Sequence, residues 1–397
     1  MPNRLWTADF RRIFLANLFL MVTYNMLYSV FLLFLIERGG TDLQGGIATY
    51  CCSICALVMR PAAGWHLDHK SRRTLTMLSL ILLAFLPMGY FLAPTVLLII
   101  VIRAVHGLLE SAASTGLTTN AYDTVSKEHF SSGVGQFGFG NAIGTAVGPA
   151  LGLYLWRNYG DLVFFASISL CTLAAYMMLR NFTFHPIEHR ETFRLEKGQL
   201  MDFLLEKRAL PASLMEGFVG FYCGCVGTYM ARFLALQGNF ADAGLYFACQ
   251  ACGTFCSRLV VGTISEKKGE GPLVWSSFFM MTTGGLLITY STTALPVYVG
   301  GMILGVSYGF MVTGMQIMSV RIVPPHRRGA AASTYCCAWD IFNAVGSLAA
   351  GILVTLFSYR VAFTAALAVC PMFLLTYVLK VSHHPSAFRA WKRQHTS

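Results

Sequence analysis

The sequence predicts an all-α integral membrane protein, with twelve transmembrane helices in two pseudo-symmetric six-helix bundles. Three observations lead to this prediction. Hydrophobic residues make up 55% of the 397 residues and charged residues only 12%, about half the charged fraction of a soluble domain. Many apolar runs reach the roughly 20 residues that cross a bilayer as a helix. The two halves of the chain also share a sequence pattern at a constant offset.

Twelve apolar runs follow one another along the chain. The first is too long for the apolar part of a signal peptide and has no small-residue cleavage site after it, so we expect an uncleaved helix. The connections are short except for 181–208, which separates six spans from six. The expected spans are 13–36, 44–66, 74–93, 95–121, 134–156, 162–180, 209–235, 242–264, 272–292, 295–320, 330–357 and 360–380.

The spans define the expected domains: an N-terminal bundle over 1–180, a central loop over 181–208, a C-terminal bundle over 209–380 and a basic tail over 381–397. With the N-terminus inside, cytoplasmic segments hold 22 of the 29 Lys and Arg residues, as expected because translocating positive charge is costly. Both termini and the central loop are therefore predicted to be cytoplasmic, in a bacterial plasma membrane. The net charge of +11 then requires no nucleic acid partner.

The cysteines leave two interpretations open. Nearly all twelve lie inside the expected spans, and Cys249, Cys252 and Cys256 share one helix face. Thiolates suit soft metal ions, but cysteine also serves as a small packing residue between helices, which we favour. The sequence contains no Walker motif, HExxH motif or nucleophile elbow, so we expect no enzyme activity, no cofactor and no resident metal.

A pattern in the connection after the second span recurs 198 residues later, at about half the chain length. Two halves related by duplication are an architecture of secondary transporters, which bind substrate near the membrane midplane between the halves. The repeated positions are Arg60, Gly64 and Asp68 with Arg258, Gly262 and Glu266, and Gly107 with Gly305.

This connection resembles the loop signature of the major facilitator superfamily, and the resemblance covers essentially the whole chain. The first copy departs from the family pattern at His69 and Ser71, and the second lacks the closing basic pair, with Glu270 and Gly271 in its place. The family uses the loop as a cytoplasmic latch between the halves; a merely solvated basic turn is the alternative. The resemblance implies as latch residues Gly64, Asp68, Arg72, Arg73, Gly262, Glu266 and Lys267.

Four ionisable residues inside the spans are candidates for proton coupling. Arg103 and Glu110 lie on one face of the fourth span, together with Gly107. A charged side chain inside a membrane span costs at least about 2.5–3.5 kcal/mol, so a charged residue there is a candidate for a functional role. In the family a similar arginine is tied to proton coupling, whereas a structural Arg–Glu pair is the alternative. Glu216 and Asp340 are the other acids within spans, and Asp340 is expected nearest to mid-membrane. We therefore expect Asp340 to be the first candidate for the proton carrier, followed by Glu110 with Arg103 as its modulator, and then by Glu216.

Glycines recur every fourth residue in the fifth span, from Gly140 onward, and form a ridge on which another helix can pack closely. Gly144, Gly148, Pro149 and Gly152 match the antiporter signature of the superfamily. The resemblance to this signature implies the drug:proton efflux branch and a tight junction between the halves. "NAIG" at 141–144 returns in part as "NAVG" at 343–346.

The resemblance also implies the substrate cavity, which the family lines mainly with its first, fourth, seventh and tenth helices. Trp339 beside Asp340 would suit a flat or cationic compound. For any single aromatic residue, helix packing is the alternative role. The candidate lining residues are Tyr24, Asn25, Tyr28, Phe221, Tyr222, Tyr308, Gln316 and Trp339.

The sequence therefore predicts a secondary active transporter that exports a small amphipathic molecule in exchange for protons by alternating access. A proton-coupled importer or a facilitator of a small metabolite is one alternative, and a non-transporting membrane sensor or scaffold on the same fold is another. The intramembrane charges argue against an inert scaffold, because such residues are costly to keep. The expected partners are the substrate, protons and the lipid bilayer, and the expected state is a monomer.

Overall fold

The computed structural model describes residues 6–125, 130–184, 206–237, 241–321, 323, 328–384 and 387. The chain forms two compact units, Met1–Phe193 and Arg194–Ser397. Helices make up both units, and the described residues include no strand.

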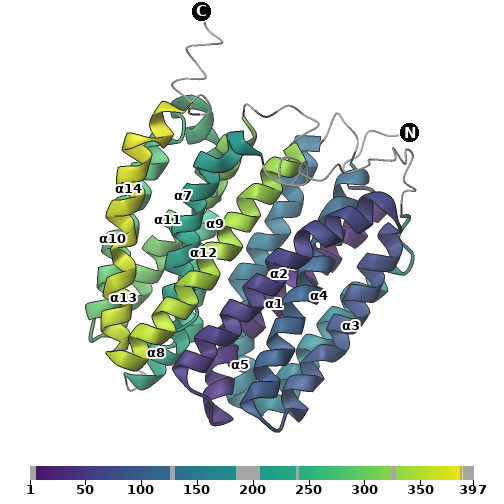
Figure 1. Ribbon diagram of the computed structural model, residues 1–397, viewed down its shortest axis with the longest axis horizontal. Helices are drawn as coiled ribbons and strands as arrows, with labels where there is room; N and C mark the ends of the chain where they lie inside the picture. The colour runs from purple at the N-terminus through teal and green to yellow at the C-terminus, as the bar shows by residue number, and fades with distance from the viewer. Residues whose placement is uncertain are drawn as a thin grey trace, which may run out of the picture. The chain divides into compact units, whose positions relative to one another are not determined.

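The N-terminal unit contains five long helices (Figure 1). Four of them begin at a Thr or Ser whose side chain accepts a hydrogen bond from a backbone N–H in the first turn, namely Thr7, Thr41, Ser71 and Thr95. Such caps satisfy donors that the helix itself leaves free. The helices are α1 (Ala8–Glu37), α2 (Asp42–His69), α3 (Arg72–Leu92), α4 (Val96–Asp123) and α5 (Phe130–Leu179).

The last of these helices, α5, is long enough for two crossings. It has 50 residues and is interrupted at Gly160, where φ is +78°. This left-handed conformation suits glycine, because a side chain there would be strained. The break separates 130–159 from 161–179, and 19 residues of helix still span about 28 Å. The N-terminal unit therefore contains six segments of transmembrane length, as the sequence predicts.

The C-terminal unit repeats this order with two further breaks. The seventh expected span is divided near Thr228 and the twelfth at Ala368. Its elements are η2 (Lys207–Ala209), α7 (Leu210–Gly227), α8 (Met230–Leu236), α9 (Ala243–Lys268), α10 (Gly271–Tyr290), α11 (Ala294–Val320), α12 (Arg328–Leu356), α13 (Tyr359–Leu367), α14 (Val369–Leu379) and η4 (Val381–His383).

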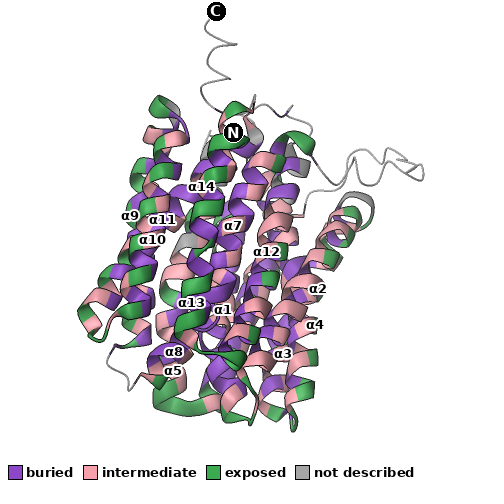
Figure 2. Ribbon diagram, turned by 60° about the vertical axis from the view of Figure 1, so that its left-hand side comes forward, coloured by how far each residue is buried: buried purple, intermediate pink, exposed green. Residues whose placement is uncertain are grey.

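The described residues contain 11 helical stretches long and apolar enough to cross a membrane, with α5 counted once. Dividing α5 at Gly160 gives the twelve predicted spans, so the prediction of an all-α membrane fold is confirmed. Large apolar side chains are exposed along these helices, including Phe85 (68%), Leu92 (72%) and Leu259 (69%); Figure 2 shows exposed and buried residues on the same helices. In a membrane these side chains contact lipid, whereas in water they would cause aggregation.

The internal repeat is visible in the packing of the helices. In the N-terminal unit α4 packs against α2, and a Cβ atom added at Gly107 would collide with the carbonyl group of Cys52. In the C-terminal unit α11 packs against α9, and a Cβ atom at Gly305 would collide with the carbonyl group of Gln250. Both partners are shifted by the same 198 residues. The two halves therefore share a helix crossing, not only a sequence pattern.

Candidate functional site

The N-terminal unit buries a positive charge. Arg103 on α4 has 2% of its surface exposed, and its guanidinium carbon lies 4.6 Å from the centre of the Phe31 ring on α1, a cation–π contact. Tyr90 of α3 and Cys52 of α2 also interact electrostatically with Arg103. Nε and Nη1 of Arg103 have no hydrogen-bond partner among the described residues. Since buried polar groups are usually satisfied, these two N–H groups are candidates for donating hydrogen bonds to a ligand.

Three candidate cavity residues lie on α1, and one of them, Tyr24, interacts with this charge. The rings of Tyr24 and Tyr28 stack with their centres 6.4 Å apart. Tyr24 interacts electrostatically with both Arg103 and Glu110, and Glu110 is half-buried. The amide of Asn25 donates a hydrogen bond to the carbonyl oxygen of Met21, 2.8 Å away on its own helix. The structure thus brings Arg103, Glu110 and Tyr24 together, while the amide of Asn25 bonds to α1 itself.

The C-terminal unit buries a carboxyl group. Glu216 on α7 is 2% exposed, and its Oε2 has no hydrogen-bond partner among the described residues. It contacts the hydroxyl group of Tyr335 on α12. That hydroxyl donates its proton to the carbonyl oxygen of Val312 on α11, at 2.7 Å. The one hydroxyl proton of Tyr335 therefore has two acceptors within reach, the carbonyl oxygen of Val312 and the carboxyl group of Glu216.

The second carboxyl group of this unit, Asp340 on α12, is 9% exposed. Its neighbour Trp339 packs edge-on against Tyr308 of α11, with the ring centres 5.8 Å apart. Gln316 on α11 is exposed, and Phe221 on α7 is half-buried. The aromatic pair beside Asp340 is therefore the arrangement in this unit that best matches the expected contact surface for a flat compound.

Tyr222 occupies a different environment from the one expected of a cavity residue. It is 5% exposed. A Cβ atom added at Gly285 on α10 would lie 2.7 Å from the hydroxyl oxygen of Tyr222. The side chain therefore points between the helices of its own bundle, and it acts there as a packing residue.

The glycine ridge of α5 packs against α1 within the N-terminal unit. A Cβ atom added at Gly148 would lie 2.6 Å from the Cβ atom of Asn25, and one at Gly152 would lie 2.8 Å from the Cα atom of Met26. Gly140 and Gly144 likewise face α1. Ser29 of α1 donates to the carbonyl oxygen of Pro149 at 3.4 Å. The flat face of the ridge is thus covered by α1, and the predicted tight junction between the halves stays a prediction.

The connection between α2 and α3 contains an ion pair of its own. Arg72 at the start of α3 pairs with Asp123 at the end of α4. Arg73 is exposed, and a Cβ atom at Gly64 would meet nothing within 4 Å. The side chain of Asp68 lies outside the described part of the structure, so its predicted latch contact stays a prediction.

The second copy of this connection contains the same pair with the charges exchanged. Glu270, which caps the start of α10, pairs at 2.8 Å with Arg321 at the end of α11. Positions 270 and 321 correspond to positions 72 and 123 at the offset of 198. The sequence interpretation noted Glu270 only as a departure from the family pattern. The offset itself was the signal that could have found the pair.

At the remaining latch positions of the second copy, the structure describes no contact that supports a latch. A Cβ atom at Gly262 would meet nothing within 4 Å, and Lys267 is exposed. The side chain of Glu266 lies outside the described part of the structure. The cysteines are free, and the described residues include no group of three side chains that could hold a metal ion.

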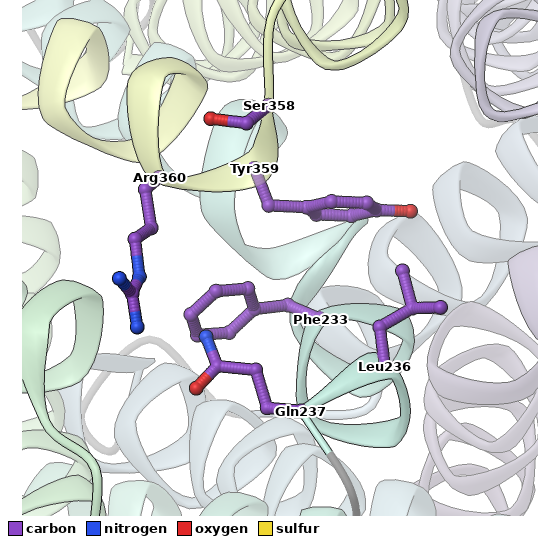
Figure 3. A pocket seen from close by; sticks show the side chains of 6 residues that line it. All are labelled: Phe233, Leu236, Gln237, Ser358, Tyr359 and Arg360. Atoms are coloured by element: carbon purple, nitrogen blue, oxygen red, sulfur yellow. The ribbon is translucent and has the colours of Figure 1, made fainter.

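A hollow of about 540 Å³ lies in the C-terminal unit, between the end of α8 and the start of α13 (Figure 3). Its lining combines one positive charge with uncharged polar and aromatic groups. The lining residues are Phe233, Leu236, Gln237, Ser358, Tyr359 and Arg360. None of them is among the candidates that the sequence suggested.

Each of the two units consists of helices of transmembrane length and contains a buried ionisable group. This combination is typical of polytopic membrane transporters. Residues 13–237 and 213–397 match the Major Facilitator Superfamily, and the chain belongs to this family. It is 24% identical to the uncharacterized MFS-type transporter YhjO of Bacillus subtilis, over 96% of this chain and 95% of YhjO.

Solved structures share the fold at low sequence identity. The nucleoside transporter NupG aligns with a TM-score of 0.73 at 11% identity, over 94% of this chain and 99% of that one. A bacterial homolog of the human lysosomal transporter Spinster, in an inward-facing and occupied conformation, aligns with a TM-score of 0.74 at 14% identity, over 93% and 95% of the two chains. These likenesses show the fold alone.

Proposed function

We propose that this membrane transporter exports a small amphipathic molecule in exchange for protons. The observation that carries the proposal is the pair of buried ionisable groups, Arg103 in one unit and Glu216 in the other, each 2% exposed. Charged side chains inside membrane helices are costly, and they mark proton relays and substrate pathways. The match of Gly144, Gly148, Pro149 and Gly152 to the antiporter signature supports export.

Glu216 is the first candidate for the proton carrier. Its carboxyl group is buried and contacts Tyr335, which belongs to an apolar cluster of α7, α11 and α12 that includes Met215 and Met311. A charged carboxylate with an unpartnered oxygen in such a place costs several kcal/mol, so burial favours proton uptake by this group. We therefore rank Glu216 ahead of Asp340, which the sequence ranks first. Asp340, beside Trp339 and Tyr308, is the better candidate for substrate contact.

Alternating access requires that parts of each bundle move together. The close α1–α5 contact at Gly148 and Gly152 would couple these two helices, because close-packed helices transmit displacement rather than absorb it. The antiporter signature then serves export by making α1, with Tyr24 and Tyr28, move with α5. This is an indirect role, unlike a direct seal between the halves.

The experiment has two stages. Cells that overproduce the protein are grown on a panel of amphipathic compounds that includes ethidium, and the compound with the largest gain in tolerance is chosen. That compound is then added to everted vesicles in which respiration has stored a proton gradient. Export by antiport predicts partial release of the gradient in the wild type and none in Glu216→Gln.

Other results of these transport measurements would favour the importer, facilitator or sensor alternatives. If purified protein in liposomes accumulates the compound together with protons, in the same direction, the importer interpretation replaces export. If the compound moves without any effect of a proton gradient, the protein is a facilitator. If no compound on the panel changes growth or moves across the membrane, the sensor interpretation gains support.

A further inference from the structure

Three buried polar side chains of the N-terminal unit have unpartnered atoms next to one another. Arg103 (2% exposed) and His106 (3%) lie on α4, one turn apart, and Tyr90 (0%) lies on α3. The centres of the Tyr90 and His106 rings are 6.0 Å apart, and the hydroxyl of Tyr90 lies near the guanidinium group of Arg103, where it can accept from it while its own proton stays available. Nε and Nη1 of Arg103, the hydroxyl of Tyr90 and Nδ1 of His106 have no hydrogen-bond partner among the described residues.

The chemistry of this cluster favours an anion. Arginine has only hydrogen-bond donors and keeps its positive charge. A tyrosine hydroxyl donates one hydrogen bond, and a histidine ring nitrogen can donate as well. Cys52, Tyr90 and Tyr24 interact with Arg103 most strongly, and Glu110 interacts with Tyr24 of this group. A compact acceptor with one negative charge would satisfy the donors and balance the buried guanidinium at once.

The other half of the chain shows that the fold does not require these polar groups. At the offset of 198, the positions of Tyr90, Arg103 and His106 correspond to Ile288, Gly301 and Leu304. Ile288 and Leu304 are buried, and the space beside Gly301 is filled by the ring of Tyr246. Apolar residues thus fill the equivalent place in the C-terminal unit, where they only pack the helices together. The polar set in the N-terminal unit calls for a ligand.

We propose that Arg103, Tyr90 and His106 form a binding site for one small monovalent anion, either a halide ion or the carboxylate group of an organic acid. The site exists once per chain, because its counterpart in the C-terminal unit is apolar. Since the three side chains are at least 97% buried, the anion must lose its water. Weakly hydrated nitrate and chloride should therefore bind better than the divalent, strongly hydrated sulfate.

This inference goes beyond proton-coupled export, because purified protein binds the anion whatever it transports. The full chain in detergent is heated in sodium sulfate, and the sulfate is replaced stepwise by chloride, nitrate or benzoate at constant ionic strength. The expected result is a saturable rise of Tm. Sulfate serves as the matched salt, since its general effect on proteins is stabilising while the site should not hold it.

Variants of the three side chains test whether the rise of Tm comes from anion binding at this site. Arg103→Gln should abolish the saturable rise, and Tyr90→Phe and His106→Leu should each weaken anion binding by about tenfold, which corresponds to about 1.4 kcal/mol. His106→Leu installs the residue of the other half. Arg38→Gln is the control, because Arg38 is partly exposed and paired with Asp161; it should keep the response. If Arg103→Gln does not fold, Tyr90→Phe and equilibrium dialysis with radiolabelled chloride still test the site.

The arms of the experiment separate the two sources of the anion. Saturation by chloride assigns an inorganic ion, whereas saturation by benzoate alone assigns the carboxylate of an organic compound. A wild-type protein that responds to none of the monovalent anions, or a response that Arg103→Gln and Tyr90→Phe leave unchanged, overturns the proposal. Proton exchange in vesicles is measured separately, so either inference can fail without the other.

Discussion

At the scale of single residues, close approach between helices depends on positions without a side chain. The ridge of α5 illustrates this, because its glycines bring the backbone of α5 against α1. The spacing of four residues predicts such a ridge from sequence. The partner helix could not be predicted, since any of the other helices could pack on it. Tyr222 shows the same limit: membership of a span does not reveal which way a side chain points.

We expect Gly148→Ala to destabilise the protein by about 1–3 kcal/mol, the usual cost of overpacking a helix contact. The new methyl group would lie 2.6 Å from the Cβ atom of Asn25 and 2.8 Å from the carbonyl oxygen of Val22. Gly138→Ala on the same helix is the matched control, because a Cβ atom there meets nothing within 4 Å. Thermal unfolding in detergent measures both. Equal stability of the two variants would contradict the packing described for the ridge.

For Glu216→Gln we expect little change in thermal stability and complete loss of proton exchange. The amide keeps the size of the carboxyl group and can donate to Tyr335, as the protonated acid does, but it carries no exchangeable charge. The vesicle assay and a melting curve report the two effects on one preparation. Asp340→Asn is the comparison. Proton exchange that survives in Glu216→Gln and disappears in Asp340→Asn would restore the order expected from sequence.

At the scale of elements, the two inter-helix ion pairs show what a repeat preserves. The start of α3 is tied to the end of α4 by Arg72 and Asp123, and the start of α10 to the end of α11 by Glu270 and Arg321. The sign of each charge has changed, but the attraction between the helix ends remains. The family pattern in the sequence shows only that the second loop departs from it. The structure explains why Glu270 stands there, because it pairs with Arg321.

We expect Arg321→Gln to destabilise the protein more than Arg72→Gln. The side chains of Arg321 and Glu270 are 10% and 3% exposed, against 16% and 29% for Arg72 and Asp123. Removing one member of a buried pair costs about 3–5 kcal/mol, whereas a more exposed pair is worth about 0–1 kcal/mol. Thermal unfolding of the two variants, prepared in the same detergent, gives the comparison.

The double variant Glu270→Arg with Arg321→Asp gives the second pair the charge order of the first. It should recover most of the stability that Arg321→Asp loses, because the attraction is restored. A double variant no more stable than Arg321→Asp would mean that the surroundings of α10 and α11, rather than the pair itself, set the sign of each charge.

At the scale of the whole molecule, the sequence predicted the helices well because bilayer-spanning helices need long apolar runs. The break at Gly160 falls between two expected spans, and the breaks near Thr228 and Ala368 fall inside spans. Those inner breaks were missed, since hydropathy does not change there. Buried charges such as Arg103 were found because they stand out in apolar runs. The partners of those charges depend on tertiary packing and could not be predicted.

The distribution of Lys and Arg residues predicts how the chain is oriented in the membrane. A reporter fused after Arg190 or at the C-terminus should read cytoplasmic, and one fused after Gly40 should read external, since 22 of the 29 Lys and Arg residues would then lie inside. Paired phosphatase and fluorescent-protein fusions measure this. An external C-terminus would contradict both the predicted number of spans and the arrangement of the chain in two six-helix halves.

The exchange of charge between the two pairs also bears on how such a gene can change. Two halves derived from one ancestor could in principle repair or overwrite each other by gene conversion. Copying the α3 segment into the place of α10 would put arginine opposite Arg321, and the reverse event would put glutamate opposite Asp123. Each conversion juxtaposes like charges, which is destabilising. Once the signs had been exchanged, the halves could no longer replace each other piece by piece, and each was free to acquire its own set of buried groups.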